Sequence, residues 1–228
     1  HGVVGRGASV MFHLDRYKPA FEITSHENGD LVSGRIDLAG VVSDLNGIAA
    51  LSYSSDNGET FEDLQFRGNK QALSVEFSVR IDTTELEDGP QVYRIRGRDR
   101  TGSEDQTAFL LFVDNKPPEI SILYPTEDQS VNGVFTVSGM TNDDVGLSQL
   151  TWTIGKDEPV DIPISPGDPY WIQEFDFTGQ TEADITFTLT DKAGNSVGQR
   201  LKLALAADED LPEVTIVYPE AGGRAEID

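Results

Sequence analysis

The sequence contains the same kind of junction three times, and this repeat limits the architectures that the chain can adopt. At each junction an apolar alternating run leads into an acidic residue, then a proline, and then a second alternating run. The middle junction covers residues 113–125, and its counterparts lie at 14–23 and 207–219. Three junctions imply two complete units between them and part of a unit at each end, as in a tandem repeat.

The two complete units align position by position. The middle section is shorter in the second unit. After it, an offset of 92 residues pairs Asp99 with Asp191 and Gly102 with Gly194. Because turn residues and apolar positions coincide together, the match is an internal repeat rather than shared composition. Before that section the offset is 99, and the matched pairs are Pro19 with Pro118, Gly34 with Gly133, Gly40 with Gly139, Asp44 with Asp143, and Tyr53 with Trp152.

Each unit consists of short alternating runs separated by turn signals. The run from Leu73 to Ile81 has an apolar residue at every second position, which is the period of a strand with one buried face. The triplet at 56–58, Asp-Asn-Gly, is typical of a tight hairpin. Seven such strands in roughly 95–100 residues match an immunoglobulin-like sandwich. The sequence therefore predicts an all-β chain of two tandem immunoglobulin-like antiparallel β-sandwiches, with about seven strands each and flanking partial-repeat strands.

The junctions divide the chain into four parts. Residues 18–115 are expected to form the first Ig-like domain and residues 116–210 the second. Residues 211–228 are expected to be the first strand of a following repeat. Residues 1–17 are expected to be the last strand of a preceding repeat, because an offset of 99 places residues 8–14 on the strand before the middle junction. The alternative is an N-terminal strand of the first full unit.

Composition excludes several classes of function. The chain has 17 basic and 40 acidic residues, which gives a net charge of −23. A chain this acidic repels nucleic acid and anionic membrane surfaces, so neither is an expected partner. No stretch approaches the roughly 20 apolar residues that span a bilayer. The lack of cysteine excludes disulfides, cysteine zinc sites and thiol catalysis, so packing alone must hold the sheets together.

Two stretches carry a resemblance to a known class of protein. Residues 93–102 and 187–195 look like the F strand and F–G turn of bacterial Ig-like and fibronectin type III-like repeats, and residues 113–118 are similar to the junction that follows in those repeats. The resemblance covers essentially all of residues 18–210. It implies a module of a long secreted or surface-anchored bacterial protein, which acts as a spacer, an adhesin segment or an accessory to an enzyme. The expected partners are other repeats of the chain, a cell-surface protein or a glycan.

The middle junction is a candidate calcium site. Calcium takes 6–8 oxygen ligands, mostly carboxylates and carbonyls, and acidic residues gather in the linker and in the loops expected beside it. The arrangement is similar to the interdomain sites of cadherins, although Lys116 stands where the cadherin linker carries another acid. The alternative is a set of solvated acidic turns, since Asp and Asn are common turn formers. The candidate ligands are Asp88, Asp114, Asn115, Glu119, Asp143 and Asp144.

Two further motifs have a structural and a functional interpretation. Residues 54–61 fit the Asp-box pattern of sialidase propellers, where it forms a structural hairpin. A single copy cannot build a propeller, so a hairpin turn is expected. Trp171 is a candidate for sugar stacking, because alternation that turns Tyr170 and Ile172 inward would leave its ring exposed. The alternative places Trp171 in the core.

No pattern indicates catalysis. The histidines are His1, His13 and His26, and none has a partner arrangement typical of a Ser-His-Asp site. Paired carboxylates are frequent only because the chain is acidic. The prediction is a non-catalytic structural or adhesive Ig-like segment of an extracellular protein. The alternative is a carbohydrate-binding or accessory module attached to an extracellular enzyme.

Overall fold

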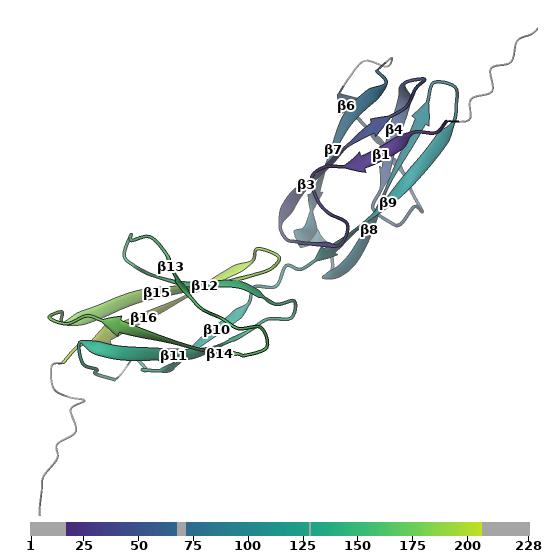
Figure 1. Cartoon of the computed structure of the whole chain (residues 1–228). Coiled ribbons are helices and arrows are strands. Elements are labelled where there is room, and N and C mark those ends of the chain that lie inside the picture. Colours follow the sequence, from purple (N-terminus) through teal and green to yellow (C-terminus); the bar gives the residue numbers. More distant parts are fainter. Residues whose placement is uncertain (1–16, 68–71, 128, 207–228) are drawn as a thin grey trace, which may run out of the picture. The chain divides into compact units, whose positions relative to one another are not determined.

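The computed structural model describes residues 17–67, 72–127 and 129–206, which form two compact units (Figure 1). Unit 1 ends at Lys116 and unit 2 begins at Pro117. The partial repeats expected at 1–17 and 211–228 lie outside the described residues, apart from Tyr17. No α-helix occurs in the described part of the chain, and the prediction of an all-β fold is confirmed. Nowhere in these ranges is there a helix with the length and apolar character needed to cross a membrane.

Unit 1 contains nine strands and one short 3-10 helix among its described residues. Two sheets are present, with the strand orders β1-β3-β7-β6 and β2-β9-β8-β4-β5. Neighbouring strands run antiparallel, except that β2 runs parallel to β9. The elements are β1 (Ala20–Ile23), β2 (Asp30–Val32), β3 (Arg35–Ser43), β4 (Ile48–Ser54), β5 (Glu62–Leu64), β6 (Phe66–Arg67), β7 (Ser74–Asp82), η1 (Thr83–Glu85), β8 (Gly89–Asp99) and β9 (Glu104–Val113).

Alternate side chains from both sheets form the core of unit 1. On β7, the predicted alternation is correct from Val75 to Ile81, where every second residue is buried. Leu73 belongs to the same apolar run but is 57% exposed, because β7 begins only at Ser74. Burying these side chains between two sheets is the main source of stability for a fold of this kind. The fully buried members of the core include Leu38, Val42, Ile48, Ile95 and Leu111.

Unit 2 contains seven strands, as the repeat predicted, in sheets of order β10-β11-β14 and β13-β12-β15-β16. All of its strand pairs are antiparallel. An isolated parallel bridge between Val131 and Leu205 takes the place of the β2–β9 pair of unit 1. The strands are β10 (Glu119–Tyr124), β11 (Val134–Asn142), β12 (Leu147–Ile154), β13 (Val160–Ile162), β14 (Tyr170–Asp176), β15 (Glu182–Asp191) and β16 (Ser196–Ala204).

The core of unit 2 is rich in aromatic rings. The ring centroids of Trp171 and Phe187 lie 5.0 Å apart, and Trp152 meets Phe175 edge-on at the same distance. Phe135 also stacks on Phe175, at 5.8 Å. Offset and edge-to-face contacts of this kind add to the free energy gained by burying the rings.

Trp171 is 3% exposed, so the expectation that its ring lies on the surface is wrong. Its neighbours Tyr170 and Ile172 are the exposed residues, at 61% and 68%. The cause lies on the partner strand, where Gly139 pairs with Trp171. A Cβ on Gly139 would clash with the Ser121 carbonyl oxygen and would lie 2.5 Å from the indole ring, so the missing side chain leaves space both for the adjacent strand and for the ring.

Adding a methyl group at Gly139 therefore tests this packing. We expect Gly139→Ala to lower the free energy of unfolding by about 1–3 kcal/mol, because the indole must shift. Gly198→Ala on β16 is the matched control, since the nearest atom to its Cβ would be 3.9 Å away, and it should stay within about 0.5 kcal/mol of wild type. Urea unfolding followed by tryptophan fluorescence measures both. Wild-type stability in Gly139→Ala would contradict the packing described here.

Candidate functional site

Two acidic loops lie side by side at one end of unit 2. Asp143 follows β11 and Asp191 ends β15, and a carboxylate oxygen of each lies within 4.8 Å of the other. The Lys192 N–H donates to the Gly146 carbonyl at 3.0 Å, which ties the two loops together. The Asp143 carboxylate accepts the Gly146 N–H at 2.6 Å, and Asp191 accepts the Asn195 N–H at 2.9 Å. The two side chains thus stabilise their own turns and also approach one another.

Unit 1 repeats this arrangement with Asp44 and Asp99. Asp44 follows β3, Asp99 ends β8, and the residues are 7% and 1% exposed. The Arg100 N–H donates to the Gly47 carbonyl at 3.1 Å, which is the counterpart of the bond between the loops of unit 2. Asp44 Oδ1 accepts the Asn46 N–H at 2.7 Å. Asp44 Oδ2 is buried and has no hydrogen-bond partner.

Asn115, a predicted calcium ligand, ties the end of unit 1 together. Its Oδ1 accepts the Thr83 hydroxyl at 2.9 Å and the Gly34 N–H at 3.3 Å. Its backbone N–H donates to the Asp88 carboxylate at 2.9 Å. These bonds use both lone pairs of the side-chain carbonyl, so Asn115 contributes to the structure of unit 1 whether or not a metal binds nearby.

The other predicted ligands are divided between the units. Asp114 belongs to unit 1, where its Oδ1 accepts a backbone N–H two residues further on, at 3.1 Å. Glu119 begins β10 and Asp144 lies in the loop before β12, and both are exposed residues of unit 2. Among the acids of unit 2, the structure brings Asp143 together with Asp191. Calcium binding by the linker residues stays a prediction.

The Asp-box segment folds as the predicted hairpin between β4 and β5, which pair at Tyr53 and Glu62. The Asp56 carboxylate accepts the Ser54 hydroxyl at 2.6 Å, the Thr60 hydroxyl at 2.5 Å and the Thr60 N–H at 2.9 Å. These hydrogen bonds, that from Ser54 first, hold the pKa of Asp56 far below its ordinary value because they favour the charged carboxylate. The motif is therefore a turn whose aspartate carboxylate is held by hydrogen bonds from within the turn.

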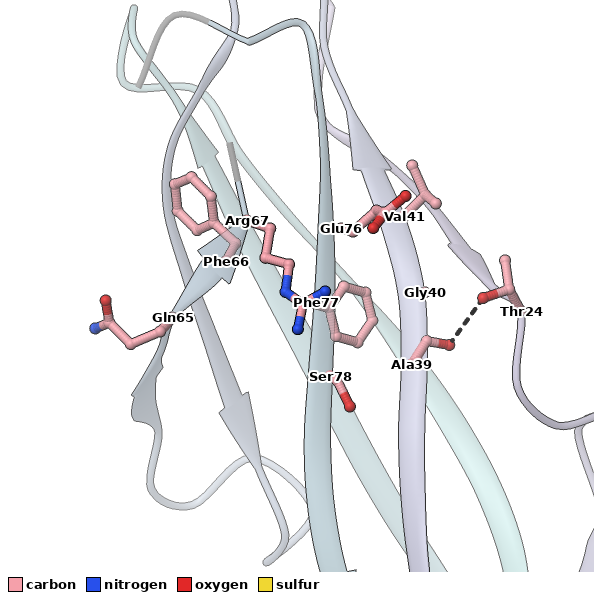
Figure 2. A pocket seen from close by; sticks show the side chains of 10 residues that line it. All are labelled: Thr24, Ala39, Gly40, Val41, Gln65, Phe66, Arg67, Glu76, Phe77 and Ser78. Atoms are coloured by element: carbon pink, nitrogen blue, oxygen red, sulfur yellow. Dashed lines mark hydrogen bonds between the residues drawn. The ribbon is translucent and has the colours of Figure 1, made fainter. Parts of the chain in front are cut away.

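A groove opens on the β1-β3-β7-β6 sheet of unit 1 (Figure 2). Its volume is about 670 Å³, and the buried Phe77 and Gly40 lie among its lining residues. Phe66 on β6 pairs with the buried Phe77 on β7, and its partly buried ring packs against the core. The exposed side chains of Arg67 and Glu76 pair on the opposite face of the sheet and line the groove with opposite charges. Charged and polar side chains at an open groove can hydrogen-bond a small molecule.

The described histidine does not complete a catalytic arrangement. His26 Nδ1 lies 2.8 Å from the Ser25 hydroxyl, its neighbour in sequence. Within the described ranges, no carboxylate bonds the other ring nitrogen, whereas a Ser-His-Asp site needs an acid there. His1 and His13 lie outside the described residues.

The solved structures that match this chain include tandem Ig-like and fibronectin III-like domains. The fibronectin(III)-like modules of Clostridium thermocellum CbhA match 86% of this chain and 100% of their own, with a TM-score of 0.52 and 11% identity. A tetra-tandem repeat in the extending region of a large adhesion protein matches 83% of this chain and 49% of its own, with a TM-score of 0.33 and 19% identity. The fold is thus confirmed as tandem Ig-like and fibronectin III-like repeats. No protein-family model and no curated protein match the sequence.

Sequence reasoning missed the acid pair of unit 1. It left Asp44 and Asp99 as turn residues. The signal was present, because the offsets of 99 and 92 match Asp44 with Asp143 and Asp99 with Asp191. The groove beside Phe66 was missed as well, because the two-residue strand β6 is too short to show a period.

The lowered pKa of Asp56 predicts a specific dependence of stability on pH. A carboxylate with a depressed folded-state pKa contributes stability above its unfolded pKa of about 4 and loses it as the pH falls toward the folded-state value. We therefore expect wild type to be more stable than Asp56→Asn near pH 7, and the difference to shrink below about pH 4. Urea midpoints across this range measure the difference. Glu59→Gln, in the same turn but outside these carboxylate hydrogen bonds, is the control, and a constant gap between wild type and Asp56→Asn would contradict the assignment.

Proposed function

We propose that the chain is a non-catalytic spacer and adhesive segment of a secreted or surface-anchored bacterial protein. The observation that carries the proposal is the repetition of one complete sandwich, with a separate core in each copy. A module with a complete core of its own can be added to a chain in series without changing the cores of the neighbouring modules. That property suits a chain that sets a distance or displays a surface.

The linker and the charge support this role. Pro117 and Pro118 follow directly after the end of unit 1, and prolines stiffen a linker because they fix the backbone φ angle. A net charge of −23 keeps neighbouring copies apart and soluble. Because the chain has no cysteine, the oxidising conditions outside a cell cannot form disulfides that would alter the fold.

The location is tested by labelling intact cells of the organism that makes the chain. We expect antibodies against residues 17–206 to label unpermeabilised cells or the culture medium, and brief protease treatment of whole cells to remove the cell-bound signal. An antibody to a cytosolic protein is the control for leakage. Label that appears only after permeabilisation would contradict the proposal.

A second candidate role is carbohydrate binding, as an accessory module of an extracellular enzyme. Trp171 cannot carry it, because its ring is buried. The observation that favours the role is the groove of unit 1, where the exposed side chains of Arg67 and Glu76 lie opposite each other on β6 and β7. A few placed hydrogen-bonding groups of this kind can bind the hydroxyls of a sugar ring.

Glycan-array binding tests this role directly. If the groove binds sugars, Arg67→Ala should weaken binding by at least about tenfold, which corresponds to about 1.4 kcal/mol. Arg98→Ala is the matched control, because Arg98 is an exposed arginine on β8, in the other sheet of unit 1. No binding by wild type, or an equal loss in both variants, would leave the spacer role as the only candidate.

A further inference from the structure

We propose that each unit carries a calcium site between two aspartates, one that follows the unit's first nine-residue strand and one that ends its penultimate strand. In unit 1 these residues are Asp44 and Asp99, and in unit 2 they are Asp143 and Asp191. A spacer needs no cation to set a distance, so this site goes beyond the proposed function.

The state of Asp44 is the first argument. The residue is 7% exposed, and its Oδ2 is buried without a hydrogen-bond partner. No described Lys or Arg forms an ion pair with it. A buried carboxylate oxygen with neither a donor nor a counter-charge is strongly unfavourable. A bound cation is a direct way to compensate it.

A second buried acid, Asp99, lies in the loop next to that of Asp44. Ile48, four residues after Asp44, pairs with Asp99 across β4 and β8, so the two loops are adjacent. Asp99 is 1% exposed, and its Oδ1 accepts the N–H groups of Thr101 and Ser103 at 2.9 and 2.7 Å. These bonds fix the carboxylate in place before any ligand arrives, which lowers the entropy lost on binding.

Unit 2 shows how close the matched pair comes. A carboxylate oxygen of Asp143 lies within 4.8 Å of one of Asp191. Two oxygens bound to one calcium ion at 2.3–2.6 Å are at most about 5 Å apart, so the observed separation fits two ligands of a single ion. Without a cation, two carboxylates at this distance repel each other. Lys192 approaches Gly146 in the same loop pair but forms no ion pair with either aspartate.

The ligand type selects a hard cation. As side-chain ligands, both pairs offer only carboxylate oxygen. Oxygen-only sites suit calcium, whereas zinc and copper prefer imidazole or thiolate. The chain has no cysteine, and none of the four aspartates adjoins a histidine in sequence.

In unit 1, the position of the pair separates the proposed site from calcium binding at the linker. In unit 1, Gly34 before β3 is bonded to Asn115 of the linker, whereas Asp44 follows the far end of the same strand. A nine-residue strand at about 3.3 Å per residue spans roughly 30 Å. A ligand at Asp44 and Asp99 therefore binds independently of the linker acids.

Calorimetric titration of the full chain with calcium chloride, after EDTA treatment and exchange into chelator-free buffer, tests the proposal. Wild type should bind two equivalents per chain. Asp44→Asn should lose one equivalent, Asp143→Asn the other, and the double variant both. Asp63→Asn, an exposed acid of β5, should keep two equivalents.

Thermal melts show whether a variant has simply failed to fold. In EDTA, Asp44→Asn should melt at or above the wild-type temperature, because it removes an uncompensated charge, and it should lose part of the rise that calcium gives wild type. No saturable binding by wild type, or two equivalents retained in both single variants, would overturn the proposal. Either result would leave the cell-labelling test of the spacer role unaffected.

Discussion

The burial of alternate side chains between two sheets is the interaction on which each unit depends. The chain has no cysteine, so no disulfide joins the sheets, and the free energy must come from packing. Among the described residues, the core of unit 1 draws on residues 21–113 and the core of unit 2 on residues 120–205. Each sandwich therefore contains all the apolar surface that it needs, and this makes the repeat modular.

The same packing places the polar groups of the turns. Because β3 and β11 are held in register along their whole length, the residues that follow them arrive at fixed points at the sandwich end. In unit 2, a loop of the other sheet then brings the carboxylate of Asp191 beside that of Asp143. The chemistry of the loops is thus a consequence of strand register, and it recurs because the register recurs.

The fold could be predicted from the sequence because the repeat and the strand period are both properties of the chain itself. The orientation of Trp171 could not be predicted, because Tyr170, Trp171 and Ile172 are all apolar. In such a run, the alternation of residue types does not show which side chains face the core. The direction of Trp171 depends on Gly139, which lies on another strand. Contacts between strands likewise decide the groove beside Phe66. The repeated acids were visible in the sequence, but burial of the Asp44 oxygen needs coordinates.

Separate expression of residues 17–116 and 117–206 tests most directly whether each sandwich is complete. If each core is self-sufficient, both fragments should fold alone, and each should unfold in urea in one cooperative transition near its midpoint in the full chain. A fragment that stays unfolded, or that loses cooperativity when its partner is removed, would contradict the account of two independent cores.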